Sequence, residues 1–291
     1  MCRLYGLRAT APTTVACCLV RARNSLMAQS RRDLQGFCNA DGWGIAAYRE
    51  RAPSIRREAS AAHQDDDFRA AAEGAVAQTL LAHVRHATVG AIRPENTHPF
   101  GCGAWSFVHN GTVPYFEQIA DAMLSAMTPE HRAAIRGSTD SEHLFHFVLA
   151  RHEREPERPL LKSLMASLRQ VLAWCRAIGD HPRLGLNVLL TDGERMVGSR
   201  WQRTLAFVER AGTAPCEICG GSHIDDALAR FSSSRAGAGS TQVEHVLAES
   251  YRALVIASEP TTAHEAWQEV PERSAFEVTP ELRLRILSLE G

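Results

Sequence analysis

The second residue of the chain, Cys2, has the clearest capacity for covalent chemistry. Methionine is normally trimmed when the next residue is small, so loss of Met1 would leave a residue with both a thiol and a free α-amine. The thiolate is a nucleophile, and the amine, with a pKa of about 7.7 to 8.0, can accept the thiol proton. A Met-Cys start alone is usually an accident. Cys2 therefore predicts an N-terminal nucleophile only if other site residues accompany it.

Four further segments carry polar side chains or glycines that suit a catalytic site. Each alone has a simple structural explanation. Asn110-Gly111 after a strand is typical of a type I′ turn, and Arg85 at a strand end is typical of a solvated charge. Asp140 in the first turn of a helix interacts favourably with the helix dipole. The segments are Asn-Ala-Asp-Gly-Trp-Gly-Ile at 39–45, Ala-His-Val-Arg-His-Ala-Thr-Val-Gly at 82–90, Val-His-Asn-Gly-Thr at 108–112 and Ser-Thr-Asp-Ser-Glu at 138–142.

The strands and helices that are expected to position these segments are grouped along the chain, first strands, then helices, then strands again. Short apolar runs bounded by turn residues predict strands, and helical spacing of apolar residues predicts helices. Thr139 and Glu142 match a capping box, so a helix is expected to place Asp140 in its first turn. Blocks of strands, helices and strands again favour an α+β fold in which helices cover packed sheets. Strands are predicted at 3–7, 43–48, 80–84, 105–108, 184–190, 196–201, 204–208, 252–257 and 275–278, helices at 115–127, 139–151 and 160–178, and a mobile loop at 232–240.

Composition narrows the class of partner. The 291 residues are 45% hydrophobic and carry 32 Lys and Arg against 33 Asp and Glu, so there is no basic excess to attract nucleic acid or an anionic membrane. No apolar run approaches the roughly 18 residues needed to span a bilayer. We therefore expect a small-molecule partner, with no nucleic acid and no membrane.

The cysteines and the arginine-rich start bear on localisation. Eight cysteines in a chain of this length are too sparse and irregular for a secreted disulfide scaffold, which favours the reducing cytoplasm. The alternative is a targeting segment. The first 32 residues hold six arginines and no acidic residue before Asp33, as in a transit peptide, but cleavage there would discard Cys2.

In this order, Cys2 and the four segments resemble the glutaminase domain of class II glutamine amidotransferases, an N-terminal-nucleophile hydrolase family. The start Met-Cys-Arg-Leu-Tyr-Gly and the Arg-Pro-Glu-Asn-Thr-His-Pro-Phe stretch at 93–100 look most like the stand-alone bacterial branch. The resemblance covers residues 2–150 with specific motifs. It continues more loosely to about Val278, through Ala-Ser-Glu-Pro at 257–260 and Trp267. It implies a four-layer αββα sandwich, one glutaminase-type domain over 2–280 and no appended synthase domain.

The resemblance also assigns catalytic roles. Cys2 would attack the γ-carboxamide carbon of glutamine, form a thioester and release ammonia, and water would then free glutamate. The α-amine of Cys2 would carry the proton. Asn110, through its side-chain amide, and Gly111, through its backbone N–H, match the oxyanion hole of the family. Gly111 is also expected to allow an unusual backbone twist.

Substrate-binding roles follow from the same resemblance. Arg85 would grip the substrate α-carboxylate with its planar fork, and Asp140 would accept the α-ammonium group. Thr88 would belong to a loop, with Val89 and Gly90, that closes over the ligand. Trp43 would support the pocket.

Two positions depart from the usual family pattern, and both put substrate breadth in question rather than reaction type. Arg3 stands where many members have glycine, and His86 stands where many have tryptophan. The four histidines of this region are irregularly spaced and lack a nearby carboxylate helix, which favours structural or pocket-polar roles over a metal site. These histidines are His83, His86, His98 and His109.

A separate motif, Cys216-Glu-Ile-Cys219-Gly-Gly-Ser-His223, leaves two alternatives open. Cys-x-x-Cys turned by glycines has the shape of a zinc knuckle, and His223 would supply a third ligand. A structural zinc site needs four ligands, however, and no second cysteine pair follows. The other alternative is a surface hairpin with two free thiols. No metal or cofactor is therefore assigned.

Three functions fit this sequence. The first is a glutaminase-type hydrolase or amidotransferase acting on the γ-amide of glutamine or of a γ-glutamyl compound, with the ammonia passed to a partner subunit or simply released. The second is a γ-glutamyl hydrolase acting on thiol-metabolite conjugates. The third is a catalytically silent glutamine-binding or scaffold protein, against which the combination of Cys2, Asn110 and Gly111 argues.

Overall fold

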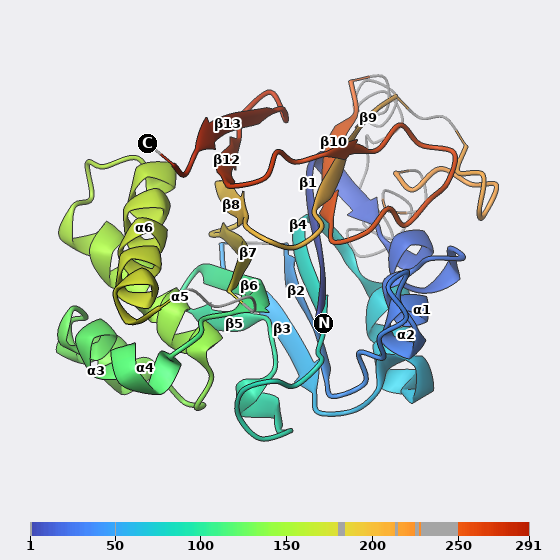
Figure 1. Ribbon diagram of the computed structural model, residues 1–291. Coiled ribbons are helices and arrows are strands. Elements are labelled where there is room, and N and C mark those ends of the chain that lie inside the picture. Colours follow the sequence, from blue (N-terminus) through green and yellow to red (C-terminus); the bar gives the residue numbers. More distant parts are fainter. Residues whose placement is uncertain are drawn as a thin grey trace.

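Two antiparallel β-sheets pack face to face, and helices cover the outer face of each, in a computed structural model of the chain (Figure 1). The structure describes residues 2–49, 51–179, 184–212, 215–224, 227 and 250–290. The layer order of helices, sheet, sheet and helices confirms the predicted αββα sandwich of the α+β class. The loop predicted at 232–240 lies outside the described residues.

In the described part of the chain, the first sheet has seven strands in the order β11-β9-β10-β1-β4-β2-β3, and the second has six in the order β13-β12-β8-β7-β6-β5. Neighbours within both sheets are antiparallel. The strands are β1 (Arg3–Thr14), β2 (Trp43–Tyr48), β3 (Pro53–Glu58), β4 (Val76–Val84), β5 (Phe100–Cys102), β6 (Trp105–Thr112), β7 (Gly185–Thr191), β8 (Met196–Arg200), β9 (Ala206–Ala211), β10 (Arg252–Ala257), β11 (Gln268–Glu269), β12 (Ser274–Val278) and β13 (Leu284–Ser288).

The helices form two unequal layers. Among the elements that the structure describes, four helices between residues 116 and 178 cover the second sheet, and two short helices near the start of the chain cover the first (Figure 1). They are α1 (Leu26–Arg31), α2 (Asp66–Gly74), α3 (Phe116–Ser125), α4 (Pro129–Ala134), α5 (Asp140–Arg154) and α6 (Leu160–Ile178), with a π-helical turn η1 (Cys17–Arg21) and 3₁₀ turns η2 (Ala62–Gln64) and η3 (Pro94–Asn96).

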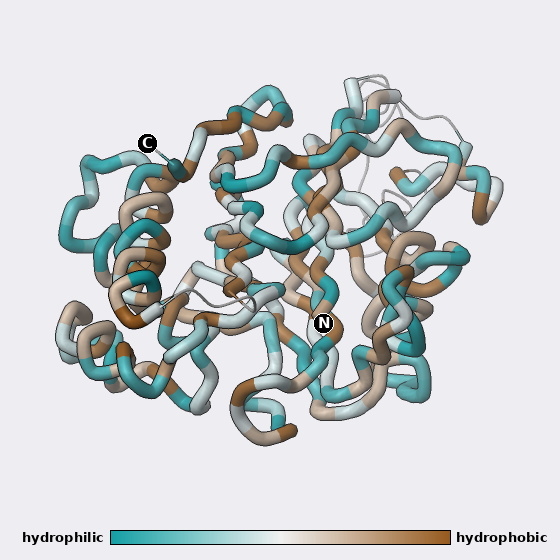
Figure 2. Tube along the Cα trace, in the orientation of Figure 1, coloured by the Kyte–Doolittle hydropathy of each residue, from teal (hydrophilic) through white to brown (hydrophobic). Residues whose placement is uncertain are grey.

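Three hydrophobic cores separate the four layers. Along β1, Tyr5 and Leu7 pack toward α1 and α2, whereas Leu4 joins the core between the sheets. Along β7, Leu190 packs toward the large helices, whereas Leu189 joins the central core. Successive side chains of a strand point to opposite faces, so these central strands need apolar residues at nearly every position. Figure 2 shows the corresponding concentration of hydrophobic residues along the inner strands.

The predicted strands and helices are present, but several have different bounds and some further elements were not predicted. β1, β4 and β6 are longer than expected because their flanking polar residues also pair within the sheets. The edge strand β3 has the sequence Pro-Ser-Ile-Arg-Arg-Glu, and its alternating exposure hides it from a search for apolar runs. Other elements that were not predicted are β5, β11, β13, α1, α2 and α4.

The capping box at the start of α5 is only half formed. The Thr139 side chain accepts a hydrogen bond from the Glu142 amide at 3.2 Å, as predicted. The Glu142 carboxylate, however, accepts from the backbone amides of Arg136 (3.0 Å) and Gly137 (2.6 Å). Glu142 therefore fixes the preceding loop and leaves Asp140 in the first helical turn, where it was expected.

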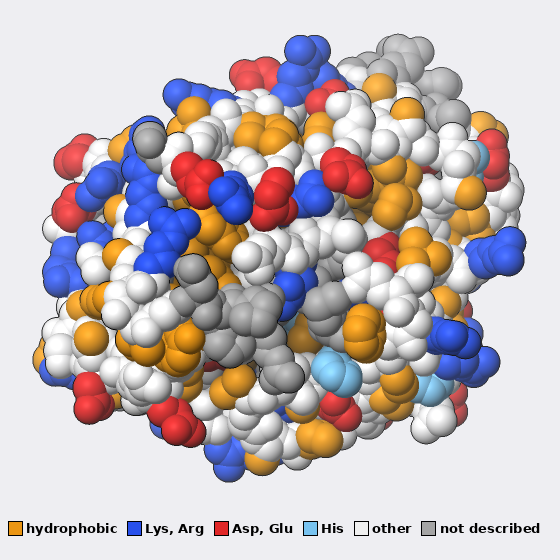
Figure 3. Space-filling view, viewed as in Figure 1, with side chains coloured by type: hydrophobic (Ala, Val, Ile, Leu, Met, Phe, Trp, Pro, Cys, Tyr) orange, Lys and Arg blue, Asp and Glu red, His pale blue; other side chains and the backbone are white. Residues whose placement is uncertain are grey.

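Two observations describe the surface and the helices as a whole. No helix in the described part of the chain is both long and apolar enough to cross a bilayer. On the face shown in Figure 3, acidic and basic side chains are interspersed, in keeping with the formal net charge of −1.

Candidate active site

Sheet topology brings Cys2 and Arg85 together. β1 begins at Arg3, and the antiparallel β4 ends at Val84, with Arg3 paired directly to Val84. Cys2 and Arg85 extend this pairing by one residue at the same edge of the sheet. Burial lowers the pKa of the Arg85 guanidinium. Electrostatic interactions with Cys2 and with Asp140 each raise this pKa by a smaller amount. Two residues far apart in the sequence thus meet at the N-terminal end of β1.

The Cys2 sulfur contacts the backbone of the residue that follows Arg85. Its Sγ accepts from the amide of His86 at 3.3 Å and lies 3.4 Å from the His86 carbonyl oxygen, to which the thiol donates. Burial raises the pKa of the Cys2 thiol, and the His86 amide and the Arg85 guanidinium lower it by smaller amounts. The thiol is therefore protonated near neutral pH.

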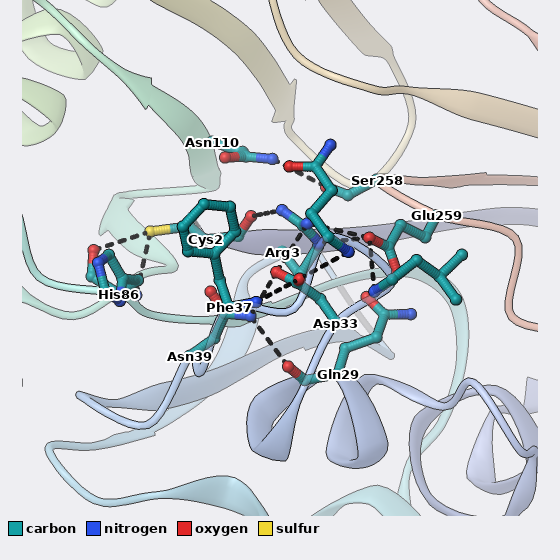
Figure 4. A network of polar contacts seen from close by, with 12 residues as sticks. Cys2, Arg3, Gln29, Asp33, Phe37, Asn39, His86, Asn110, Ser258 and Glu259 are labelled. Carbon is teal, nitrogen blue, oxygen red and sulfur yellow. Dashed lines mark hydrogen bonds and ion pairs between the residues drawn. The ribbon is translucent and has the colours of Figure 1, made fainter. Parts of the chain in front are cut away.

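Asn110 lies in the second sheet and is joined to the start of β1 through Ser258. Asn110 Nδ2 donates to Ser258 Oγ at 3.1 Å, and the same Oγ accepts from the Leu4 amide at 3.0 Å. Figure 4 shows Asn110 and Ser258 beside the Cys2-Arg3 segment. Since Nδ2 carries two hydrogens, the bond to Ser258 leaves one for another acceptor.

Asn110 and Gly111 belong to β6, where they pair with Asn187 and Leu186 of β7, so they do not form the turn that an Asn-Gly pair usually indicates. The expected backbone twist is also wrong, since Gly111 is not in the left-handed region. The glycine is needed for a close approach instead. A Cβ at Gly111 would lie 2.0 Å from the Gly185 carbonyl oxygen. Only glycine fits at this position.

Asp140 fixes the first turn of α5 to the end of β6. Its Oδ2 accepts from the Val113 amide at 2.7 Å, and Oδ1 accepts from the Ser141 amide at 2.9 Å and lies 3.2 Å from the Ser141 hydroxyl. Asp140 as a whole residue is 3% exposed. A carboxylate offers about four acceptor positions, so one remains after these three contacts.

The Arg85 guanidinium is buried and engaged with the loop that follows it. Nη1 donates to the Ala91 carbonyl at 3.1 Å, and Nη2 donates to those of Val89 (2.9 Å) and Gly90 (3.3 Å). Thr88 lies in this loop and is exposed. Arg85 thus holds the loop against the site in this conformation, and its fork is occupied by carbonyl oxygens.

A buried ionic network beneath Cys2 was not predicted from the sequence (Figure 4). Arg3 is 1% exposed, and its Nη2 lies 2.7 Å from Asp33 Oδ2 and 2.9 Å from Glu259 Oε1. Its Nη1 donates to the Cys2 carbonyl at 2.9 Å. Glu259 also accepts from the Leu34 amide. The network joins the segment of Cys2 to the loop after α1 and to the residues that follow β10, so Arg3 fixes the backbone position of Cys2.

Glu259→Gln should lower the free energy of unfolding by about 3 kcal/mol, because it removes one partner of a buried arginine. The matched control is Glu269→Gln. Glu269 pairs with Arg200, but its side chain is 80% exposed, so its loss should change stability by less than about 1 kcal/mol. Denaturant unfolding of both variants measures the difference. Equal effects would show that the Arg3 network is not a structural anchor.

The remaining predicted residues have structural contacts. His109 bridges Ser141 Oγ and the Gly185 carbonyl, each at 2.9 Å, and burial lowers the pKa of His83 to about 3. Trp43 is fully buried and donates to Asp65 Oδ2 at 2.8 Å. It packs against Phe68 in the core under α2, so it supports the first sheet.

Comparisons with known proteins identify the family of the chain. A family model described as class II glutamine amidotransferases matches residues 1–277. A probable glutamine amidotransferase of Saccharomyces cerevisiae is 26% identical over 96% of this chain and 82% of its own length. A gamma-glutamyl-hercynylcysteine sulfoxide hydrolase of Mycobacterium tuberculosis is 27% identical over 96% of this chain and 93% of its own length.

Solved structures share the fold. A glutamine aminotransferase class-II domain protein from Silicibacter pomeroyi superposes with a TM-score of 0.62 at 19% identity, covering 99% of this chain and all of that one. Glutamine phosphoribosylpyrophosphate amidotransferase of Bacillus subtilis gives a TM-score of 0.61 at 14% identity, over 99% of this chain and 49% of that chain. From the family match over nearly the whole sequence, the chain belongs to the class II glutamine amidotransferase family.

Proposed function

We propose that this enzyme cleaves the γ-amide of glutamine, or of a γ-glutamyl compound, through a thioester on Cys2. The observation that carries the proposal is the placement of Cys2 and Arg85 at the same end of two paired strands, with an electrostatic interaction between their side chains, in a chain of this family. Residues 2–280 would form one glutaminase-type domain. We place the protein in the cytoplasm on the sparse and irregular spacing of its cysteines in the sequence.

The proton balance requires a base. The raised pKa keeps the Cys2 thiol protonated, and within the described residues its sulfur bonds only to the backbone of His86. We assign the base to the α-amine that loss of Met1 would expose. The sulfur then attacks the amide carbon as the amine takes the thiol proton, the C–N bond breaks as that proton passes to the leaving ammonia, and water hydrolyses the thioester to glutamate.

Asn110 and Gly111 would stabilise the oxyanion of each tetrahedral intermediate. Asn110 is held by the Ser258 hydroxyl, and no other described residue accepts from Nδ2, which leaves one N–H for the substrate. Gly111 follows it in the same strand, with no side chain to obstruct approach. Donors fixed before the reaction stabilise the developing charge without reorganisation cost.

Arg85 and Asp140 would read the amino-acid head group. Asp140 keeps one acceptor position for an α-ammonium group, and Arg85 would bind the α-carboxylate. Nη2 uses both of its hydrogens on the carbonyls of Val89 and Gly90, so a bidentate contact through Nη1 and Nη2 requires at least one of these carbonyls to be released. We therefore propose that the loop carrying Thr88 rearranges when substrate binds.

Arg85→Lys should reduce kcat/KM for glutamine by about 10²-fold, since a point charge cannot reproduce the bidentate fork. The control is Arg57→Lys. Arg57 also donates to backbone carbonyls of a nearby loop, those of Thr97 and Pro99, but has no role in the proposed head-group site. Steady-state glutamate release compares the two. Equal, small losses of kcat/KM in both variants would show that Arg85 does not bind the substrate.

A γ-glutamyl hydrolase acting on thiol-metabolite conjugates is the second candidate. It is favoured by the similarity to the Mycobacterium tuberculosis protein over almost the whole of both chains. Both candidates use the same thioester on Cys2 and differ only in the group attached to the γ-nitrogen. In the first candidate the ammonia passes to a partner subunit or is released.

The assay that tests the proposal measures glutamate release from three substrate classes: glutamine, γ-glutamyl-cysteine-type conjugates and simple acyl amides. Cleavage of γ-glutamyl compounds, with no cleavage of N-acetylated or α-esterified analogues, is expected. Preferential cleavage of simple acyl amides would overturn the head-group assignment. Binding of glutamine without turnover by a chain that lacks Met1 would favour the catalytically silent alternative.

A further inference from the structure

Four side chains at the opposite end of β1 from Cys2 converge on one point. Cys17, Cys216, Cys219 and His223 each direct a ligand atom to this point, and the four atoms lie within 4.8 Å of one another. The sequence motif offered three of these ligands. Cys17, from a distant segment, completes the set of four that a structural zinc site requires. We propose that these residues bind a zinc ion.

The sheet explains why Cys17 meets the later motif. β10 is antiparallel to both β1 and β9, so β1 and β9 run in the same direction and end at the same edge of the sheet. β1 ends at Thr14 and leads into the π-helical turn that begins at Cys17, and β9 ends five residues before Cys216. An ion at this edge would join the two segments that leave the sheet.

The Cys216–Cys219 turn has the backbone geometry of a metal-binding knuckle. The Gly220 amide donates to the Cys216 carbonyl at 2.7 Å, and the Ile218 amide donates to Cys216 Sγ at 3.4 Å. An amide hydrogen bond to sulfur stabilises a thiolate ligand and fixes its direction. Gly220 has φ of +71°, which favours glycine and closes the turn.

His223 is also held in place from outside the turn. Its carbonyl oxygen accepts from the Thr14 amide at 3.1 Å and from the Thr14 hydroxyl at 3.2 Å. Thr14 is the last residue of β1, three positions before Cys17. The backbone that carries His223 is thereby tied to the segment that carries Cys17, independently of any metal.

The ligand chemistry and dimensions select the ion. Two sulfurs bound to a tetrahedral zinc ion at about 2.3 Å lie about 3.8 Å apart, so the observed cluster needs to contract by no more than about 1 Å. Three thiolates and an imidazole suit zinc and exclude the hard cations calcium and magnesium. Because the protein supplies all four ligands, the site is closed and structural. β1 separates it from Cys2 by roughly 35–40 Å, at about 3.3 Å per residue.

A second group of potential ligands is less complete. Cys102, His131 and His146 also lie close together, but they number only three. The two histidines contact each other through their Nδ1 atoms at 3.1 Å, and His131 Nε2 contacts Glu153 at 2.8 Å. Both nitrogens of His131 are therefore already used.

The test begins with the unmodified chain purified without chelators or an affinity tag that binds metals. Elemental analysis should find about one zinc ion per chain. Replacement by cobalt(II) should give the intense visible bands of a tetrahedral site and thiolate-to-metal charge transfer in the near ultraviolet. Titration with a mercurial reagent should release the zinc, and removal of the ion should lower Tm.

Variants then assign the ligands. Cys17→Ser and Cys216→Ser should each reduce bound metal at least about tenfold under competition with a chelator, whereas the control Cys38→Ser, an exposed thiol outside the cluster, should retain it. Absence of zinc from the native chain, together with no tetrahedral cobalt spectrum, would overturn the proposal even if the variants fail to fold. A disulfide among the three cysteines in the metal-free native chain would overturn it as well.

Discussion

Cys2→Ala is expected to abolish glutamate release from glutamine while the protein stays folded. Cys2 is half-buried and directly precedes β1. Its sulfur contacts only the His86 backbone among the described residues, so replacing the thiol by the methyl group of alanine removes few packing contacts. The thiol nevertheless carries the whole covalent route. Residual turnover should be below detection.

The controls for this variant separate chemistry from folding. Cys38→Ala removes another thiol of the same region and should retain full activity, because Cys38 is exposed and outside the proposed mechanism. Denaturant midpoints of both variants should stay close to that of the native chain. Substantial glutamine hydrolysis by folded Cys2→Ala would refute the nucleophile assignment.

Asn110→Ala should lower kcat by about 10² to 10³-fold with little change in KM, the effect of losing one oxyanion donor. The physical reason is that the donor meets negative charge only in the transition state. Asn110 is 1% exposed and also bonds to Ser258, so some loss of stability will accompany the change. Measurement of kcat and KM on folded protein isolates the catalytic effect.

Ser258→Ala is the matched control for Asn110. It removes the other end of the same hydrogen bond but leaves the amide donor in place. Its kcat should fall much less than that of Asn110→Ala. If the two variants lose kcat equally, Asn110 acts only through its contact with Ser258 and is not an oxyanion donor.

The fold was predictable where residue pattern and tertiary environment agree. β2, with every residue but one buried, and α6, with apolar residues at helical spacing, have the bounds expected from the sequence. β3 was missed because its Arg56 and Glu58 are exposed at a sheet edge, where pairing needs no apolar run. Asn110-Gly111 was less predictable, since its local signal for a turn is overridden by pairing with β7.

The residues of the candidate site also divide into those that the sequence identifies and those that only the folded structure reveals. Cys2, Arg85, Asn110 and Asp140 were identifiable because their types and order match a known family. Arg3 was identifiable only as a departure from that family, because its partners Asp33 and Glu259 come from segments that meet only in the folded chain.

The most direct test of the central claim is peptide-level mass spectrometry of the protein after reaction with an electrophilic glutamine analogue. We expect one adduct per chain, on the Cys2 thiol of molecules that lack Met1, and no adduct on molecules that retain Met1. Prior incubation with glutamine should slow the labelling. Modification of another cysteine with Cys2 untouched, or equal labelling and full activity in protein proved to retain Met1, would show that Cys2 is not an N-terminal nucleophile.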